Sequence, residues 1–223
     1  MNVADITIDQ LLDTVVRLRA HPDRDEISKK ILPLGGLSNL EQWQADVEFN
    51  EHSQDPQEFA GMLEIIRGCG SLLEIGSRFG GTLRRMAEVL APYSRITSVD
   101  LPMKDGSTLN PAPSLKANCL HIAKSGHKVE LLLADSHDPE TVRRVSDAGP
   151  YDFCFIDGDH SYEGVKADWE NYGPMAKIIG FHDIINPPSQ VDRLWAELKT
   201  QYRHKEIIFS QDSHMLGIGV IFK

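Results

Sequence analysis

Cysteine is scarce in this sequence of 223 residues. There are three, Cys69, Cys119 and Cys154, and no two of them stand in a C-x-x-C pair. An odd set without paired spacing gives no sign of a disulfide framework or a thiolate metal site. Cys154 lies inside an apolar run, so we expect it to be a small core residue, and a reducing compartment suits all three.

Positive charge and long apolar runs are lacking as well. Lysine and arginine number 23 against 33 acidic residues, which gives a net charge of -10, and no basic stripe is present. Binding to a nucleic-acid backbone needs such a stripe. No apolar run approaches the roughly 20 residues of a membrane-spanning helix, and the first residues lack the charged and apolar regions of a signal peptide. We therefore expect a cytoplasmic protein that binds neither nucleic acid nor membranes.

The first part of the chain predicts helices and no strand. Residues 7–20 carry apolar side chains at helical spacing, behind a T-x-x-Q capping pattern. Asp55-Pro56 predicts the start of another helix, which continues into FAGMLEIIR. We assign residues 1–54 to a helical extension that caps the site or forms a homodimer contact, and residues 55–223 to the main domain.

After Gly70, short apolar runs alternate with amphipathic stretches. Helical stretches separate the first five runs, which is typical of βαβ units and a parallel sheet. The connection between the last two runs is too short for a crossover helix, so these two should pair antiparallel. The runs are SLLEI, RITSV, KVELLLA, YDFCFI, AKIIGF, KEIIF and GIGVIF. The sequence thus predicts an α/β fold with a seven-stranded, mainly parallel sheet whose last strand is antiparallel.

Ligands of such sheets bind outside the carboxyl ends of the strands. The first run ends in EIGSRFGGTLRRM, where Gly76, Gly80 and Gly81 allow a tight turn before a helix that starts near Thr82. The free N–H groups of that helix suit an anionic or polar group. The spacing is not G-x-G-x-x-G, which disfavours a nicotinamide-dependent reductase. Glu74, inside the strand, needs a partner if it is buried.

The second and third runs also end in polar residues. Asp100 follows Gly76 by 24 positions and can accept hydrogen bonds from ribose hydroxyls; the alternative is that it merely begins a loop. Asp135 and Ser136 follow the third run and could flank a purine edge.

The fourth run ends in FIDGDHSYEGV, with Asp157, Asp159 and His160, and the fifth ends in His182-Asp183. Neighbouring strands lie about 5 Å apart, so the two groups should converge. Three explanations are open at this point: a divalent metal site, a metal-free acid/base site, and a polar network that supports a cofactor pocket.

Taken together, these motifs resemble class I S-adenosylmethionine-dependent methyltransferases. The later motifs are similar to the subgroup called methyltransferase domain 24, which is close to metal-assisted O-methyltransferases of catechol-type and antibiotic-sugar substrates. The resemblance covers about residues 55–223 and rests on LLEIGSRFGGTL, ITSVDLP, LLLADSHD, YDFCFIDGDHSYEGVKADWENY, IIGFHDI and GIGVIFK. It implies a three-layer Rossmann-like sandwich and S-adenosylmethionine as the cofactor.

The resemblance also implies roles for the strand ends. The stretch from residue 74 to residue 81 would bracket the methionine moiety, Asp100 would bind the ribose, and the residues after the third run would lie beside the adenine. The implied cofactor-binding set is Glu74, Gly76, Ser77, Gly80, Gly81, Thr82, Asp100, Leu101, Asp135, Ser136 and Asp157.

In the related metal-assisted enzymes, the matching strand ends supply an Asp and then an Asp-Asn or Glu-Asp pair. On this chain the ligands of Mg²⁺ or Mn²⁺ would be Asp157, His182 and Asp183, and the histidine is a departure from that pattern. His160 and Asp157 are the candidate catalytic residues, because an imidazole suits the deprotonation of a hydroxyl. A helix-capping or supporting histidine is the alternative for His160.

The expected function is methyl transfer from S-adenosylmethionine to a hydroxyl of a small molecule, such as a sugar or a natural product. Residues 101–114, rich in Pro, Gly and Ser, are a candidate lid. Trp169 and Tyr172 are expected to be packing residues. A metal-dependent hydrolase is an alternative that leaves Glu74, the glycine turn and Asp100 unexplained. A non-catalytic binding protein on a methyltransferase scaffold is a further alternative.

Overall fold

The computed structural model describes residues 55–102, 112–186, 188–209 and 216–223. The expected extension at residues 1–54, with its helices, and residues 103–111 of the expected lid lie outside these ranges. No helix in the described ranges is long and apolar enough to cross a membrane.

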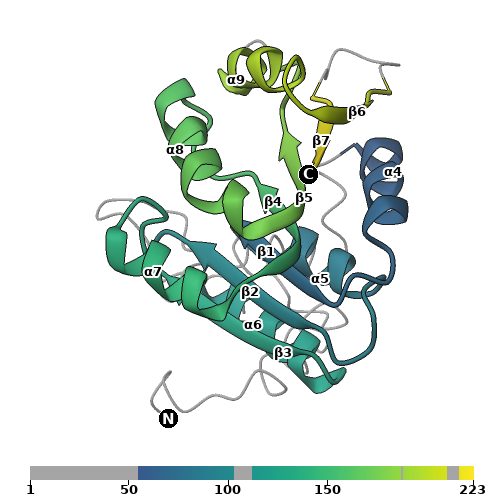
Figure 1. Ribbon diagram of the computed structural model, residues 1–223. Helices are drawn as coiled ribbons and strands as arrows, with labels where there is room; N and C mark the ends of the chain where they lie inside the picture. Colours follow the sequence, from purple (N-terminus) through teal and green to yellow (C-terminus); the bar gives the residue numbers. More distant parts are fainter. Residues whose placement is uncertain (1–54, 103–111, 187, 210–215) are drawn as a thin grey trace, which may run out of the picture.

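A seven-stranded sheet runs through the middle of the molecule (Figure 1). Its spatial order is β3-β2-β1-β4-β5-β7-β6. The first five strands in the chain are parallel, whereas β7 runs antiparallel to both of its neighbours. The strands are β1 Ser71–Ile75, β2 Arg95–Asp100, β3 Lys128–Leu133, β4 Tyr151–Ile156, β5 Ala176–His182, β6 Arg203–Ile207 and β7 Ile218–Phe222. The predicted fold class is confirmed, including the antiparallel last strand.

Helices cover both faces of this sheet and complete three layers. Side chains of α4, α5 and α6 pack with one set of strand residues, and those of α7, α8 and α9 pack with the other set. Successive residues of a strand therefore serve opposite layers, as Leu72 and Leu73 do in β1. The helices are α4 Pro56–Ile66, α5 Gly81–Ala87, α6 Ala112–Lys124, α7 Pro139–Ala148, α8 Tyr162–Tyr172, the 3-10 turn η3 Gly173–Met175, and α9 Val191–Leu198.

Local caps fix where several helices begin. The Asp55 carboxylate accepts hydrogen bonds from the N–H groups of Gln57 and Glu58 at 2.8 and 2.9 Å, as the Asp55-Pro56 pattern predicts. Asp138 caps α7 in the same way. Helix α6 begins at Ala112, so the last residues of the expected lid segment are helical.

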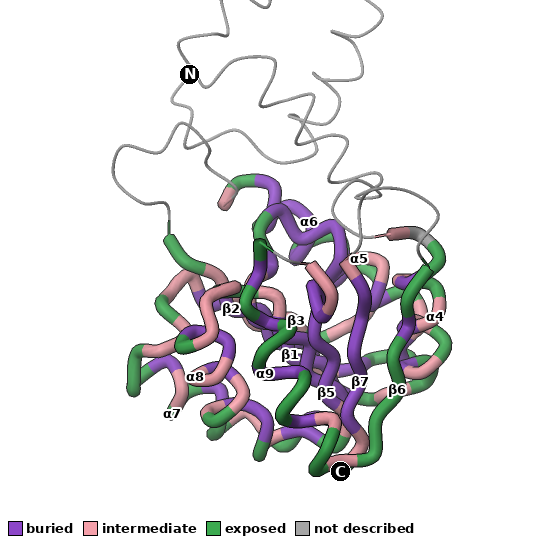
Figure 2. Tube along the Cα trace, turned by 90° about the horizontal axis from the view of Figure 1, so that it is seen from above, coloured by how far each residue is buried: buried purple, intermediate pink, exposed green. Residues whose placement is uncertain are grey.

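Burial separates the interior strands from one edge strand (Figure 2). Strands β1, β4, β5 and β7 are mostly buried, whereas four of the five residues of β6 are exposed. This strand spans residues 203–207 rather than the apolar run at residues 205–209. An edge strand has at most one face in contact with the core, so few of its side chains need to be apolar. The apolar run in the sequence is therefore a poor guide to where β6 begins and ends.

Candidate active site

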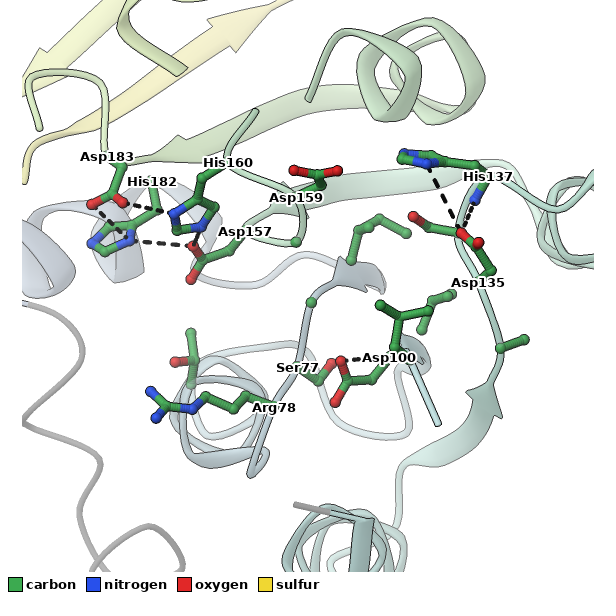
Figure 3. Close-up of a pocket in the computed structure, with 18 of the residues that line it drawn as sticks. Ser77, Arg78, Asp100, Asp135, His137, Asp157, Asp159, His160, His182 and Asp183 are labelled. Atoms are coloured by element: carbon green, nitrogen blue, oxygen red, sulfur yellow. Dashed lines mark hydrogen bonds and ion pairs between the residues drawn. The ribbon is translucent and has the colours of Figure 1, made fainter. Parts of the chain in front are cut away.

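A cavity of about 920 Å³ opens at the carboxyl ends of strands β1 to β5. This is the edge of an open α/β sheet where ligands bind, next to β1 and β4, where the strand order reverses. The cavity is lined by Ile75, Gly76, Ser77, Arg78, Thr82, Val99, Asp100, Leu101, Ala134, Asp135, Ser136, His137, Asp157, Gly158, Asp159, His160, His182, Asp183, Asn186 and Leu216. Figure 3 shows its polar side chains facing a common space.

The loop after β1 supplies the floor of the cavity. Gly76 has a φ of 88°, and a Cβ at this position would lie 2.2 Å from the carbonyl oxygen of Asp157. The close approach of the β4 end therefore requires glycine here, whether or not a ligand is bound. Ser77 and Thr82 line the cavity, whereas Gly80 and Gly81 lie at the start of α5, outside the lining.

Glu74 lies behind this floor and has no access to solvent. Neither of its carboxylate oxygens makes a well-formed hydrogen bond with the described residues. Burial raises the pKa of Glu74 to about 8, the Ser77 hydroxyl opposes this rise, and the charges of Asp157 and Asp100 add to it. A neutral carboxyl group is the form that this site stabilises near pH 7.

One end of the cavity carries the polar residues of β2 and β3. The Asp100 carboxylate accepts a hydrogen bond from the N–H of Leu101 at 3.0 Å, and burial raises the pKa of Asp100 to about 6. The loop after β3 lies beside it, since the N–H of Ala134 donates to the carbonyl of Asp100 at 2.8 Å. Asp135 and Ser136 line the same end, as predicted.

The other end carries four side chains from β4, β5 and the loops that follow them, which we call the quartet: Asp157, His160, His182 and Asp183 (Figure 3). Nε2 of His160 lies 3.2 Å from Oδ1 of Asp157, and Nδ1 lies 3.0 Å from Oδ2 of Asp183. Nδ1 of His182 lies 3.2 Å from Oδ1 of Asp157 and 3.4 Å from Oδ1 of Asp183. The predicted convergence of the two strand ends is confirmed.

The quartet is an ion-pair network. Its two carboxylates raise the pKa of His160 to about 10, although burial opposes this. Burial alone would raise the pKa of Asp157, but the two imidazoles lower it to about 2. The pKa of Asp183 is lowered by the same neighbours against burial. His160 is therefore a charged imidazolium near neutral pH, with each ring nitrogen facing a carboxylate.

Metal ligation by Asp157, His182 and Asp183 stays a prediction. Within the described ranges, no three His, Cys, Asp or Glu side chains form a group that could hold a metal ion. The carboxylate oxygens of the quartet face imidazole nitrogens instead. As arranged, the residues do not fit a metal, and we derive no chemical step from one.

Sequence reasoning overlooked several residues of the cavity. His137 lies in the loop after β3, two positions beyond Asp135, and it also lines the cavity. Arg78, Asn186 and Leu216 also line it. His137 could have been predicted, because it lies close to the carboxyl end of β3. Leu216 could not, because it precedes the antiparallel strand β7 and does not follow the carboxyl end of a parallel strand.

Comparisons with known proteins agree with this geometry. A family model described as a methyltransferase domain, Methyltransf_24, matches residues 73–184, which is half of the chain. The chain belongs to this methyltransferase family. Its motifs and fold identify it as a class I S-adenosylmethionine-dependent methyltransferase. No curated protein sequence matches it.

Solved structures, two of them described as O-methyltransferases, share the fold of this chain. An O-methyltransferase from Bacillus cereus in complex with S-adenosylhomocysteine is 18% identical, with 83% of this chain and 91% of that chain covered and a TM-score of 0.61. The O-methyltransferase TomG from Streptomyces achromogenes, involved in tomaymycin synthesis and solved with S-adenosylmethionine, is 13% identical, with coverages of 82% and 88% and a TM-score of 0.59. Cofactor-bound Rv0187 from MTB is 16% identical, with coverages of 91% and 97% and a TM-score of 0.62.

Proposed function

We propose that this methyltransferase transfers a methyl group from S-adenosylmethionine to a hydroxyl group of a small molecule. One observation carries the proposal: a single cavity joins the acidic ends of β2 and β3 to the quartet at the ends of β4 and β5. The first end suits a nucleoside and the second suits a group that loses a proton.

The chain's residues fit the cofactor by charge and by position. Five aspartates line the cavity, and Arg78 is the one lysine or arginine among its described lining residues. S-Adenosylmethionine carries a sulfonium and an ammonium group, and its sulfonium activates the methyl group for transfer. Asp100 would accept hydrogen bonds from the ribose hydroxyls, and Ser77 and Thr82 would line the methionine portion. Buried Glu74 would lie beneath that portion.

The quartet would orient the acceptor and take up its proton. A hydroxyl placed against Asp157 or Asp183 would donate a hydrogen bond to a carboxylate, which would orient its oxygen for reaction. The cofactor would supply the activated methyl group, and the quartet would take up the hydroxyl proton, with deprotonated His160 as its strongest base. The carboxylates raise the pKa of His160 to about 10. The fraction of protein molecules in which His160 is deprotonated and can accept the proton therefore grows as the pH rises.

Cofactor binding tests the first half of the proposal. Titration calorimetry with S-adenosylhomocysteine should show binding to the wild-type protein, and Asp100→Ala should weaken it at least tenfold through the loss of two hydrogen bonds. Asp152→Asn is the matched control, because Asp152 lies at the opposite end of the strands and pairs with Lys177 at 2.7 Å. A wild-type protein without affinity for this ligand would refute the proposal and favour the hydrolase alternative.

Acceptor screening tests the second half. The wild-type protein should form S-adenosylhomocysteine from S-adenosylmethionine in the presence of hydroxylated small molecules, and mass spectrometry would locate the methyl group. His160→Ala should slow transfer while the cofactor still binds. Activity that requires added Mg²⁺ or Mn²⁺, and is lost in Asp183→Ala, would support the predicted metal ligands. Activity that is unchanged by chelators would instead refute the predicted role of these residues as metal ligands.

A further inference from the structure

Helix α8 supports the cavity from behind through polar groups on its buried face. Tyr172 is fully buried, and its hydroxyl donates a hydrogen bond of 2.5 Å to the carbonyl oxygen of Ser136. A phenylalanine would meet the demands of packing at this position. The hydroxyl adds a directional contact with the loop between β3 and α7, so Tyr172 does more than the packing role that its sequence position suggests.

Asp168 is a second such group, one helical turn before Tyr172. Its side chain is fully buried, and Oδ1 lies 3.2 Å from Nε2 of His137. Its Oδ2 lies directly behind Gly158, 3.4 Å from where a Cβ would stand on that glycine. Neither oxygen makes a well-formed hydrogen bond with the described residues. Burial raises the pKa of Asp168 to about 6, although Ser136 and His137 oppose the rise.

The loop that these groups contact depends on α8 for its position. Nε2 of His137 lies 3.2 Å from the carbonyl oxygen of Gly164 as well as 3.2 Å from Asp168. The Asp135 carboxylate binds the N–H of His137 at 2.9 Å, which is a contact within the loop itself. The N–H of Ala134 donates a hydrogen bond to β2, and this is the last backbone contact of the loop with the sheet in the described residues. Contacts with α8 therefore fix Ser136 and His137 against the cavity.

A buried carboxylate is costly when its hydrogen bonds are incomplete. Packing alone does not call for a carboxyl group at position 168, so we explain it by what it touches. Those neighbours are Gly158, Ser136 and His137, and all three line the cavity. Asp168 and Tyr172 themselves do not line it, so they can act on a ligand only through the loop.

We propose that Asp168 and Tyr172 are positioning residues for the nucleoside end of the cofactor site, which they shape by holding Ser136 and His137 in place. This inference rests on the proposed cofactor site. It also assigns a second task to α8, because the helix begins two residues after His160 and thus links the quartet with the loop at the far end of the cavity.

The test measures the affinity of the full chain for two ligands by calorimetry. S-Adenosylhomocysteine has both a nucleoside and an amino-acid portion, whereas 5′-methylthioadenosine lacks the amino-acid portion. Tyr172→Phe and Asp168→Asn should each weaken both ligands by the same factor, about five- to tenfold, since the lost contact acts on the nucleoside portion.

Two control variants separate positioning from stability. Tyr162→Phe removes a hydroxyl of the same helix that bonds to Glu197 at 2.9 Å, away from the loop, and should leave both affinities unchanged. Ile221→Val lowers stability from the buried part of β7 and should also leave them unchanged. If Tyr172→Phe matches these controls, or if its loss of affinity is confined to S-adenosylhomocysteine, the inference is wrong. A wild-type protein that binds neither ligand refutes the proposed function itself, whereas normal wild-type binding with an insensitive Tyr172→Phe refutes only the inference.

Discussion

Glu74 should make the stability of this methyltransferase fall as the pH rises. Its carboxyl group has a pKa of about 8 in the folded protein, because it is fully buried, and an ordinary value of 4.5 in the unfolded chain. Between these two values the folded protein binds more protons than the unfolded chain does. By linkage, the stability that protonated Glu74 contributes is complete below pH 4.5 and is lost as the pH rises to about 8.

The size of the loss follows from the two pKa values. One pH unit corresponds to 1.36 kcal/mol, so the interval from 4.5 to about 8 amounts to about 5 kcal/mol for Glu74 alone. Glu74→Gln keeps the shape of the neutral carboxyl group and removes its titration. The variant should therefore resemble the wild-type protein at pH 5 and exceed it in stability by several kcal/mol at pH 8.5.

Urea unfolding, without cofactor and followed by circular dichroism from pH 5 to pH 8.5, measures this difference. Groups such as Asp100 and Asp168 titrate in both proteins, so the difference between the two curves isolates Glu74. Glu163→Gln, on an exposed face of α8, is the control and should run parallel to the wild type. Parallel curves for Glu74→Gln as well, within about 1 kcal/mol of each other, would show that Glu74 is ionised in the folded protein and would refute the reasoning.

Three further outcomes test other parts of the structure. Glu58→Ala should destabilise the protein by roughly 2–4 kcal/mol in urea unfolding. The buried Glu58 carboxyl group accepts hydrogen bonds from the N–H groups of Phe209 and Gly217, at 3.0 and 2.9 Å. A loss of stability smaller than that of an exposed Glu→Ala control would contradict this. Gly76→Ala should cost about 3 kcal/mol or more, because it combines a φ of 88° with a Cβ position 2.2 Å from the Asp157 carbonyl oxygen; an unchanged melting temperature would count against the described close approach. The pKa of His160 is raised to about 10, so the stability that charged His160 contributes is complete below pH 6.5 and is lost as the pH rises to about 10. His160→Gln should therefore flatten the plot of unfolding free energy against pH over that interval. A variant that keeps the wild-type slope would mean that the imidazole is not charged.

The sequence predicted those parts of the fold that depend on local pattern. Buried parallel strands are mostly apolar, so β1, β4 and β5 stood out as short apolar runs, and acids and histidines follow directly at the ends of β4 and β5. Asp55 predicted the start of α4 correctly, because a side-chain cap needs only a neighbour in sequence. The position of β6 was shifted by two residues, because an exposed edge strand has few apolar side chains to mark it.

The candidate site was predictable in outline for a topological reason. Parallel strands deliver their carboxyl ends to one edge, which brought Asp100, Asp157 and His182 to one cavity. The network itself was not predictable, because each ring of the quartet contacts carboxylates from two loops. The two carboxylates beside His160, the residue predicted to deprotonate a hydroxyl, raise its pKa to about 10. Asp168 was overlooked because one polar residue on an amphipathic helix gives no sign of whether it faces solvent or the sheet.

The position of β7 inside the sheet constrains how the chain assembles. Strand β6 precedes β7 in sequence, yet it bonds to no strand except β7 within the described part of the sheet. On the ribosome, β6 must therefore wait without a partner strand until residues 218–222 have emerged and paired with β5. A nascent chain released before that point would present the open edges of β5 and β6 to other chains, which makes the synthesis of the last strand the step most exposed to aggregation.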